Sequence, residues 1–145
     1  MKLRALLLAS FVVLSAAACG DSGSADTGTF AATPAAVLTT TAGSFRIAVH
    51  SAPDATPSRG VNALRLVVTK VGDGTPASGL DLDIVPWMPA MGHGASVKPS
   101  VAPSAEPGVY TVSNVNLFMP GLWEIRATIG GATQADHATA QFEVQ

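Results

Sequence analysis

The amino-acid sequence predicts an all-β protein, an immunoglobulin-like antiparallel β-sandwich of about seven strands. Three observations support this prediction. Apolar residues alternate with other residues at a period of two in several short segments, as in strands that bury one face. Many of the 14 glycines and 10 prolines lie between these segments, where they favour turns. Within residues 43–145, no stretch of helical length has an apolar period of 3.6 residues. A small barrel or a cupredoxin-like arrangement is the alternative fold.

The expected strands follow one another between turn signals from residue 43 onward. In the first strand, Phe45, Ile47 and Val49 alternate with Arg46 and Ala48. Further strands are expected at residues 61–71, 80–84, 95–101, 109–117, 123–129 and 138–144, and 95–101 has the weakest pattern. Sandwiches bury large rings between their sheets, so the two tryptophans, Trp87 and Trp123, are expected in the core.

The N-terminus has the pattern of a lipoprotein signal peptide over residues 1–18. Lys2 and Arg4 precede an apolar run of about 14 residues, shorter than the ~20 that span a bilayer. The run ends in small residues before Cys19, the only cysteine, and resembles a bacterial lipobox in which that cysteine is lipidated. The alternative is an ordinary secreted chain with an unpaired thiol. We expect an extracytoplasmic protein that is lipid-anchored through Cys19 to a bacterial membrane, in the periplasm or on the cell surface.

The composition divides the rest of the chain and excludes two classes of function. Residues 19–42 are mostly Gly, Ser, Asp, Thr and Ala, which predicts a flexible tether before a folded domain over residues 43–145. The net charge is −2 and no basic stripe occurs, so we expect no nucleic-acid partner. No nucleophile elbow, zinc-binding helix or phosphate-binding loop is present, so we do not expect an enzyme.

One segment differs from the strand pattern and concentrates side chains that can bind a metal. Met88, Met91 and His93 lie close together in a Pro- and Gly-rich loop, and Met119 lies in a later turn. Thioether sulfur and imidazole together favour Cu(I), and methionine binds a metal without losing a proton. These four residues are therefore the predicted metal ligands, with Cu(I) as the cofactor. The alternative is that the methionines fill gaps in the core and Gly-His-Gly forms a turn.

Strand direction predicts that these ligands meet at one end of the domain. With antiparallel neighbours, every second strand along the chain ends at the same pole of a sandwich. The loop 88–93 and Met119 both follow such strands, provided that residues 95–101 also form a strand. We expect His50 at the same pole, where it would be an exposed residue at the end of its strand. We expect His137 to be exposed at the opposite pole.

Two segments resemble the signature of the YtkA-like family, which is related to FixH. They read Met-Pro-Ala-Met-Gly-His-Gly at residues 88–94 and Phe-Met-Pro-Gly-Leu-Trp-Glu-Ile at 118–125, and Gly-Val-Tyr at 108–110 introduces the strand between them. The resemblance extends over about residues 45–144. It implies an extracytoplasmic β-sandwich, often lipid-anchored, with the four predicted ligands on the family's motif positions. FixH relatives are associated with the assembly of copper-containing cytochrome oxidases, which makes a copper-protein client the candidate partner.

We therefore expect a lipid-anchored extracytoplasmic module that binds Cu(I) through a Met/His cluster, for copper delivery or buffering. The alternative is a metal-free structural or protein-interaction β-sandwich module. In that alternative, proline and glycine set the loop, while Met119 and Trp123 fill the core.

Overall fold

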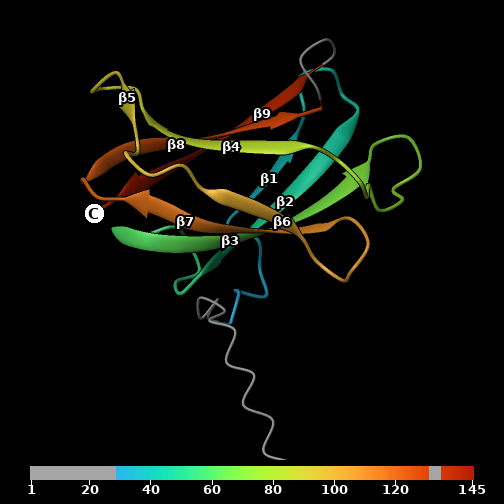
Figure 1. The fold of residues 1–145 in the computed structure, drawn as a ribbon, viewed down its shortest axis with the longest axis horizontal. Coiled ribbons are helices and arrows are strands. Elements are labelled where there is room, and N and C mark those ends of the chain that lie inside the picture. The colour runs from blue at the N-terminus through green and yellow to red at the C-terminus, as the bar shows by residue number, and fades with distance from the viewer. Residues whose placement is uncertain (1–28, 131–134) are drawn as a thin grey trace, which may run out of the picture.

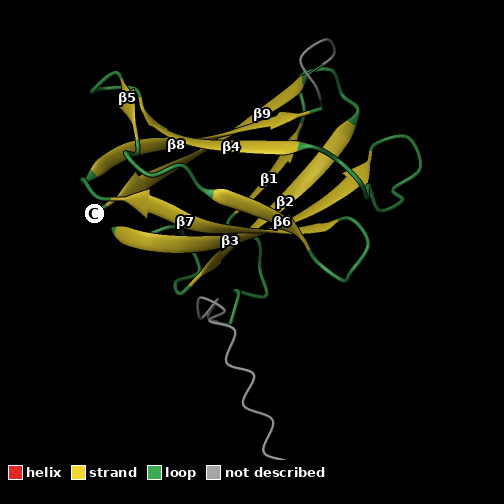
Figure 2. Ribbon diagram, viewed as in Figure 1, coloured by secondary structure: helices red, strands yellow, loops and turns green. Residues whose placement is uncertain are grey.

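The structure, a computed structural model, describes residues 29–130 and 135–145. Two antiparallel sheets pack face to face, and Figures 1 and 2 show the two layers. One sheet has the strand order β1-β2-β3-β7-β6 and the other β5-β4-β8-β9. The strands are β1 (Ala36–Thr39), β2 (Phe45–Ala52), β3 (Gly60–Lys70), β4 (Leu82–Met88), β5 (His93–Gly94), β6 (Ser100–Pro103), β7 (Val109–Leu117), β8 (Gly121–Ile129) and β9 (Asp136–Val144). In the described ranges, no helix is long and apolar enough to cross a membrane.

The predicted all-β sandwich is confirmed, with nine strands rather than about seven. The two additional strands, β1 and β5, have only four and two residues, too few for a clear alternation. The strand expected at 95–101 forms later, as β6, because residues 95–99 cross between the sheets. The Ala95 amide still donates to the Pro86 carbonyl of β4, at 3.2 Å, whereas Ser100 already pairs with Ser113 of β7.

The ordered domain begins before residue 43, which corrects the expected extent of the tether. β1 pairs with β2, and before β1 the Ala31 amide donates to the Ser51 carbonyl at 3.1 Å. The tether predicted over 19–42 therefore includes an edge strand, which the sequence hides among threonine and alanine. The first part of that tether, Cys19 and the predicted signal peptide lie outside the described residues.

The core lies between the sheets, and the alternation along each strand decides which side chains enter it. Trp123 of β8 is fully buried, as predicted. Trp87 is not in the core, and the prediction for this residue was wrong. In β4 the buried positions are alternate and include Pro86 and Met88, so Trp87 lies on the outer face of the sheet. There it is half-buried beneath the Arg126 guanidinium, whose carbon lies 4.8 Å from the ring centre.

The Gly-Val-Tyr segment at the start of β7 anchors the chain that connects β3 to β4. The Tyr110 hydroxyl donates to the Ala77 carbonyl at 2.9 Å and accepts from the Leu80 amide at 3.0 Å. Gly108 has a φ of +72°, and a Cβ there would lie 2.7 Å from the Val68 carbonyl oxygen. This segment therefore fixes the chain that leads into β4.

Asp136 ties the start of β9 to the turn between β1 and β2, at the pole opposite the methionine-bearing loops. Its Oδ1 accepts hydrogen bonds from the Ala42 amide at 2.8 Å and from the His137 amide at 2.9 Å. Burial alone would raise the pKa of Asp136. The nearby Thr40 hydroxyl, the two amides and the Ser44 hydroxyl outweigh burial and lower the pKa from 3.8 to about 2.

Asp136→Asn is expected to lower the free energy of unfolding by about 1–2 kcal/mol at neutral pH. Because the pKa of Asp136 is lower in the folded state, its ionised form stabilises the fold above about pH 4. This stabilisation is lost as the pH falls from about 4 towards 2. Urea unfolding of both proteins from pH 7 to pH 2 tests this, and a difference that stays constant with pH would exclude ionisation as its cause.

Candidate functional site

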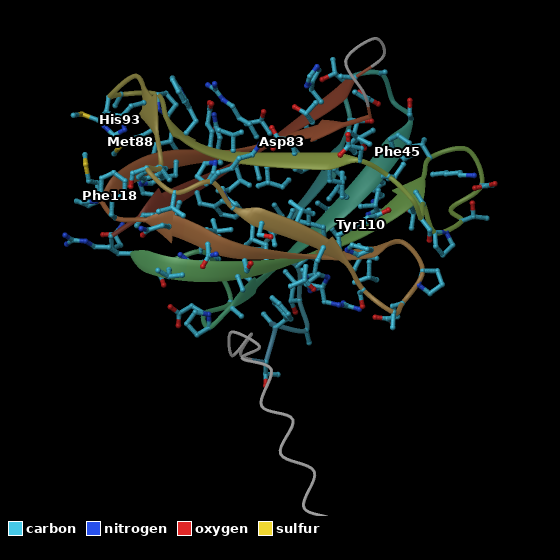
Figure 3. All side chains as sticks on the ribbon, viewed as in Figure 1. Phe45, Asp83, Met88, His93, Tyr110 and Phe118 are labelled. Atoms are coloured by element: carbon cyan, nitrogen blue, oxygen red, sulfur yellow. The ribbon has the colours of Figure 1, made fainter. Side chains whose placement is uncertain are left out.

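The end of β4, the short strand β5 and the turn between β7 and β8 meet at one pole of the sandwich. The β4–β8 ladder pairs Trp87 with Glu124, so the chain that follows β4 lies beside the start of β8. Figure 3 shows Met88, His93 and Phe118 at this same end, where the yellow sulfur atoms also gather. The structure thus brings together the loop 88–93 and the turn that carries Met119, as the strand directions predict.

Met88 and His93 are direct partners across the β4–β5 ladder. Directly opposed residues of an antiparallel pair project to the same face with their Cβ atoms about 4.5–5.5 Å apart. Met88 is only 4% exposed, so this face is the inner one. The turn between them is tight, because the Met91 and Gly92 amides both donate to the Met88 carbonyl, at 3.1 and 3.0 Å. The loop therefore holds the imidazole on the same side as a buried thioether.

The three methionines differ in how firmly the fold holds them. Met88 is buried, and a Cβ on Gly121 would lie 2.7 Å from its methyl carbon, so glycine leaves the room that this methyl group occupies. Met119 is partly buried against the core. Met91, at the tip of the turn, is 55% exposed. Two thioethers are thus packed against the protein, and the third is presented to solvent.

His93 is half-buried, and the fold constrains its ring in two ways. Its Nδ1 lies 3.1 Å from the Gly94 carbonyl oxygen, which favours the tautomer that donates from Nδ1 and leaves the Nε2 lone pair available. The Phe118 ring stacks on the imidazole, with centroids 6.2 Å apart and planes 7° apart. The ring orientation is therefore set by the protein, as it is for histidines that bind metals.

The turn between β7 and β8 is held by the indole of Trp123. Trp123 Nε1 donates to the Met119 carbonyl at 2.9 Å, and Phe118 meets the indole edge-on with centroids 5.7 Å apart. Arg59 Nε donates to the Phe118 carbonyl at 3.3 Å. Sequence reasoning did not single out Phe118 or Gly121 as parts of the site. The only sequence signal for them is their position in the segment that carries Met119.

The other two histidines are not part of this cluster. His50 was predicted to be an exposed strand-end residue, and this prediction was wrong. It is 9% exposed, with Nδ1 2.8 Å from the Ala31 carbonyl oxygen, because the N-terminal segment covers it. It also lies on the opposite face of β2 from the core residue Val49. His137 is exposed and pairs with Thr128 at the opposite pole, as predicted.

The chemistry available at this pole is that of neutral, soft donors. Among residues 29–130 and 135–145, no three His, Cys, Asp or Glu side chains are grouped as metal ligands. A metal at this pole would depend on thioether sulfur together with the imidazole of His93. That donor set suits Cu(I) better than it suits the oxygen-preferring ions.

Comparison with curated proteins and with solved structures gives no match. The family model described as YtkA-like matches residues 40–128, which include both segments of this pole and exclude β9. The match spans more than half of the chain. The chain therefore belongs to the YtkA-like family, which is extracytoplasmic in general.

Proposed function

We propose that this domain binds Cu(I) at the pole described above and delivers or buffers it outside the cytoplasm, attached to the membrane by a lipid on Cys19. The observation that carries the proposal is the register pair of Met88 and His93, which puts a thioether and an imidazole on one inner face. Met91 follows in the same turn, and Met119 lies in the neighbouring one.

The chemistry of these donors fits an oxidising compartment. Thioether and neutral imidazole bind Cu(I) without a thiolate, which oxygen would convert to sulfenic acid or a disulfide. Methionine has no proton to release when it binds a metal. Of the proposed ligands, only the imidazole of His93 must bind in its unprotonated form.

The graded exposure of the methionines favours exchange of the metal over permanent storage. Met88 is held by packing against the start of β8, whereas Met91 is 55% exposed. An exposed thioether can leave the metal and be replaced by a soft donor of an incoming protein. Such replacement changes no oxidation state and needs no cofactor. A copper-protein client would be the recipient.

An anaerobic titration of the full chain in detergent, with Cu(I) in competition with a chromophoric chelator, tests the metal proposal. We expect a one-to-one complex between Cu(I) and the protein. If micromolar protein takes up no Cu(I), the metal proposal is wrong. The domain would then be a structural or protein-interaction module, and its partner should remain bound after treatment with a chelator.

The lipid anchor is tested separately from the metal. Cys19 is the only cysteine of the chain, so a thiol-linked lipid has one candidate position. Cells fed a labelled fatty acid should incorporate label into the wild-type chain and not into Cys19→Ala. Equal labelling of the two proteins, or no labelling of either, would contradict the anchor.

A further inference from the structure

Phe118 is an exposed aromatic residue whose ring is nevertheless fixed in position. It is 36% exposed and does not belong to the buried core. One ring face lies parallel to His93 at 6.2 Å, and the ring meets the indole of Trp123 at 5.7 Å and 70°. Both separations fall in the range of about 4.5–7 Å that favours aromatic pairs. Because Trp123 is fully buried, Phe118 joins a rigid core residue to the imidazole.

The stacking on His93 has two chemical consequences at the proposed metal site. It limits rotation of the imidazole, so that Nδ1 stays near the Gly94 carbonyl and Nε2 keeps one direction. It also places a hydrocarbon ring beside the imidazole, which limits the access of water from that side. Apolar surroundings of this kind control solvent access to a metal and the dielectric around it.

Metal ions differ in the ligands that they prefer and in how much water they need in their coordination shell. Cu(I) and Ag(I) accept few, soft ligands and need no water in their coordination shell. Cu(II) prefers nitrogen and oxygen ligands in a tetragonal arrangement, in which water would fill the remaining positions. Zn(II) is held in proteins by thiolate, imidazole and carboxylate groups, and this pole offers only the imidazole of these three. A site with thioether donors beside an apolar ring therefore disfavours the divalent ions.

We infer that Phe118 is a positioning residue that makes the pole selective for soft monovalent ions over divalent ions. This inference rests on the proposed function, because it concerns the same site. Phe118 does not bind the metal in this arrangement. It acts through His93, whose ring plane it orients, and through the apolar ring that it places beside the imidazole.

The experiment compares Phe118→Ala with Phe118→Tyr, which keeps the stacked ring, and with Leu122→Ala as a matched control. Leu122 is 38% exposed at the start of the neighbouring β8, so its removal deletes a similar amount of exposed apolar surface at the same pole. Affinities for Cu(I), Ag(I), Cu(II) and Zn(II) are measured for each protein. Nitrogen-15 NMR of the metal-free proteins reports the tautomer of His93, a property that general loss of stability would not change.

Phe118→Ala is expected to lower the ratio of Cu(I) to Cu(II) affinity by about tenfold or more, the usual size of an effect of residues around a metal ligand. In this variant we expect His93 to be a mixture of its two neutral tautomers. Phe118→Tyr should keep the wild-type affinity ratio and the wild-type tautomer of His93. Leu122→Ala should change neither the ratio nor the tautomer. An unchanged ratio in Phe118→Ala, with Cu(I) still bound by the wild type, overturns the inference alone. A wild type that binds neither Cu(I) nor Ag(I) overturns the proposed function, and the inference with it.

Discussion

Replacing Met91 by Leu and His93 by Ala in one variant is expected to lower the affinity for Cu(I) by about a hundredfold or more, since two proposed ligands are lost. The metal-free variant should unfold at nearly the wild-type temperature. Met91 is 55% exposed and His93 is half-buried, so neither contributes much to the core. Chelator competition measures the affinity, and thermal unfolding without metal measures the stability.

Met88→Leu tests the same proposal at a buried position, because it removes a proposed ligand and keeps the packing. Met88 is 4% exposed and packs in the core, and leucine keeps its volume while it removes the sulfur. Such a swap costs less than about 1.5 kcal/mol of stability. It should weaken Cu(I) binding without unfolding the domain. If the double variant instead lost much stability and kept its copper, Met91 and His93 would be packing residues and the metal proposal would fail.

The long strands could be predicted because each has one buried face. In β8 and β9 the alternation of buried and exposed residues continues to the end of the strand. Once these strands are assigned as antiparallel, the meeting of the loop 88–93 with Met119 follows from chain direction alone. This part of the candidate site thus depends only on local pattern and on counting strands.

The predictions that failed depend on contacts between segments distant in sequence. His50 is buried because Ala31, 19 residues away in the chain, covers its outer face. Trp87 is tolerated on an outer face because Arg126 of the neighbouring strand covers its ring. The stacking of Phe118 on His93 likewise joins two loops, and neither local pattern contains it. A single sequence has no signal for such pairs.

Trp123→Ala is expected to have the largest effect on stability, a loss of about 3–5 kcal/mol in the free energy of unfolding. The variant removes a fully buried ring and leaves a cavity between the sheets. It also leaves the Met119 carbonyl without the indole N–H that it accepts from at 2.9 Å, and it removes the edge contact that supports Phe118. Because domains of this size are stable by only about 5–15 kcal/mol, this loss should remove a large share of the stability and lower the midpoint of thermal unfolding by several degrees.

Trp87→Ala is the control that separates burial from ring size. Trp87 lies on the outer face and is half-buried beneath Arg126, so its loss should cost only about 1 kcal/mol. Urea unfolding followed by circular dichroism gives both values without relying on tryptophan fluorescence. Equal losses in the two variants would mean that Trp123 does not span the core. A large loss for Trp123→Ala alone would show that burial of the ring, and not its size, supplies the stability. The same indole donates to the Met119 carbonyl, so the residue that fills the core also holds the turn that bears this proposed copper ligand.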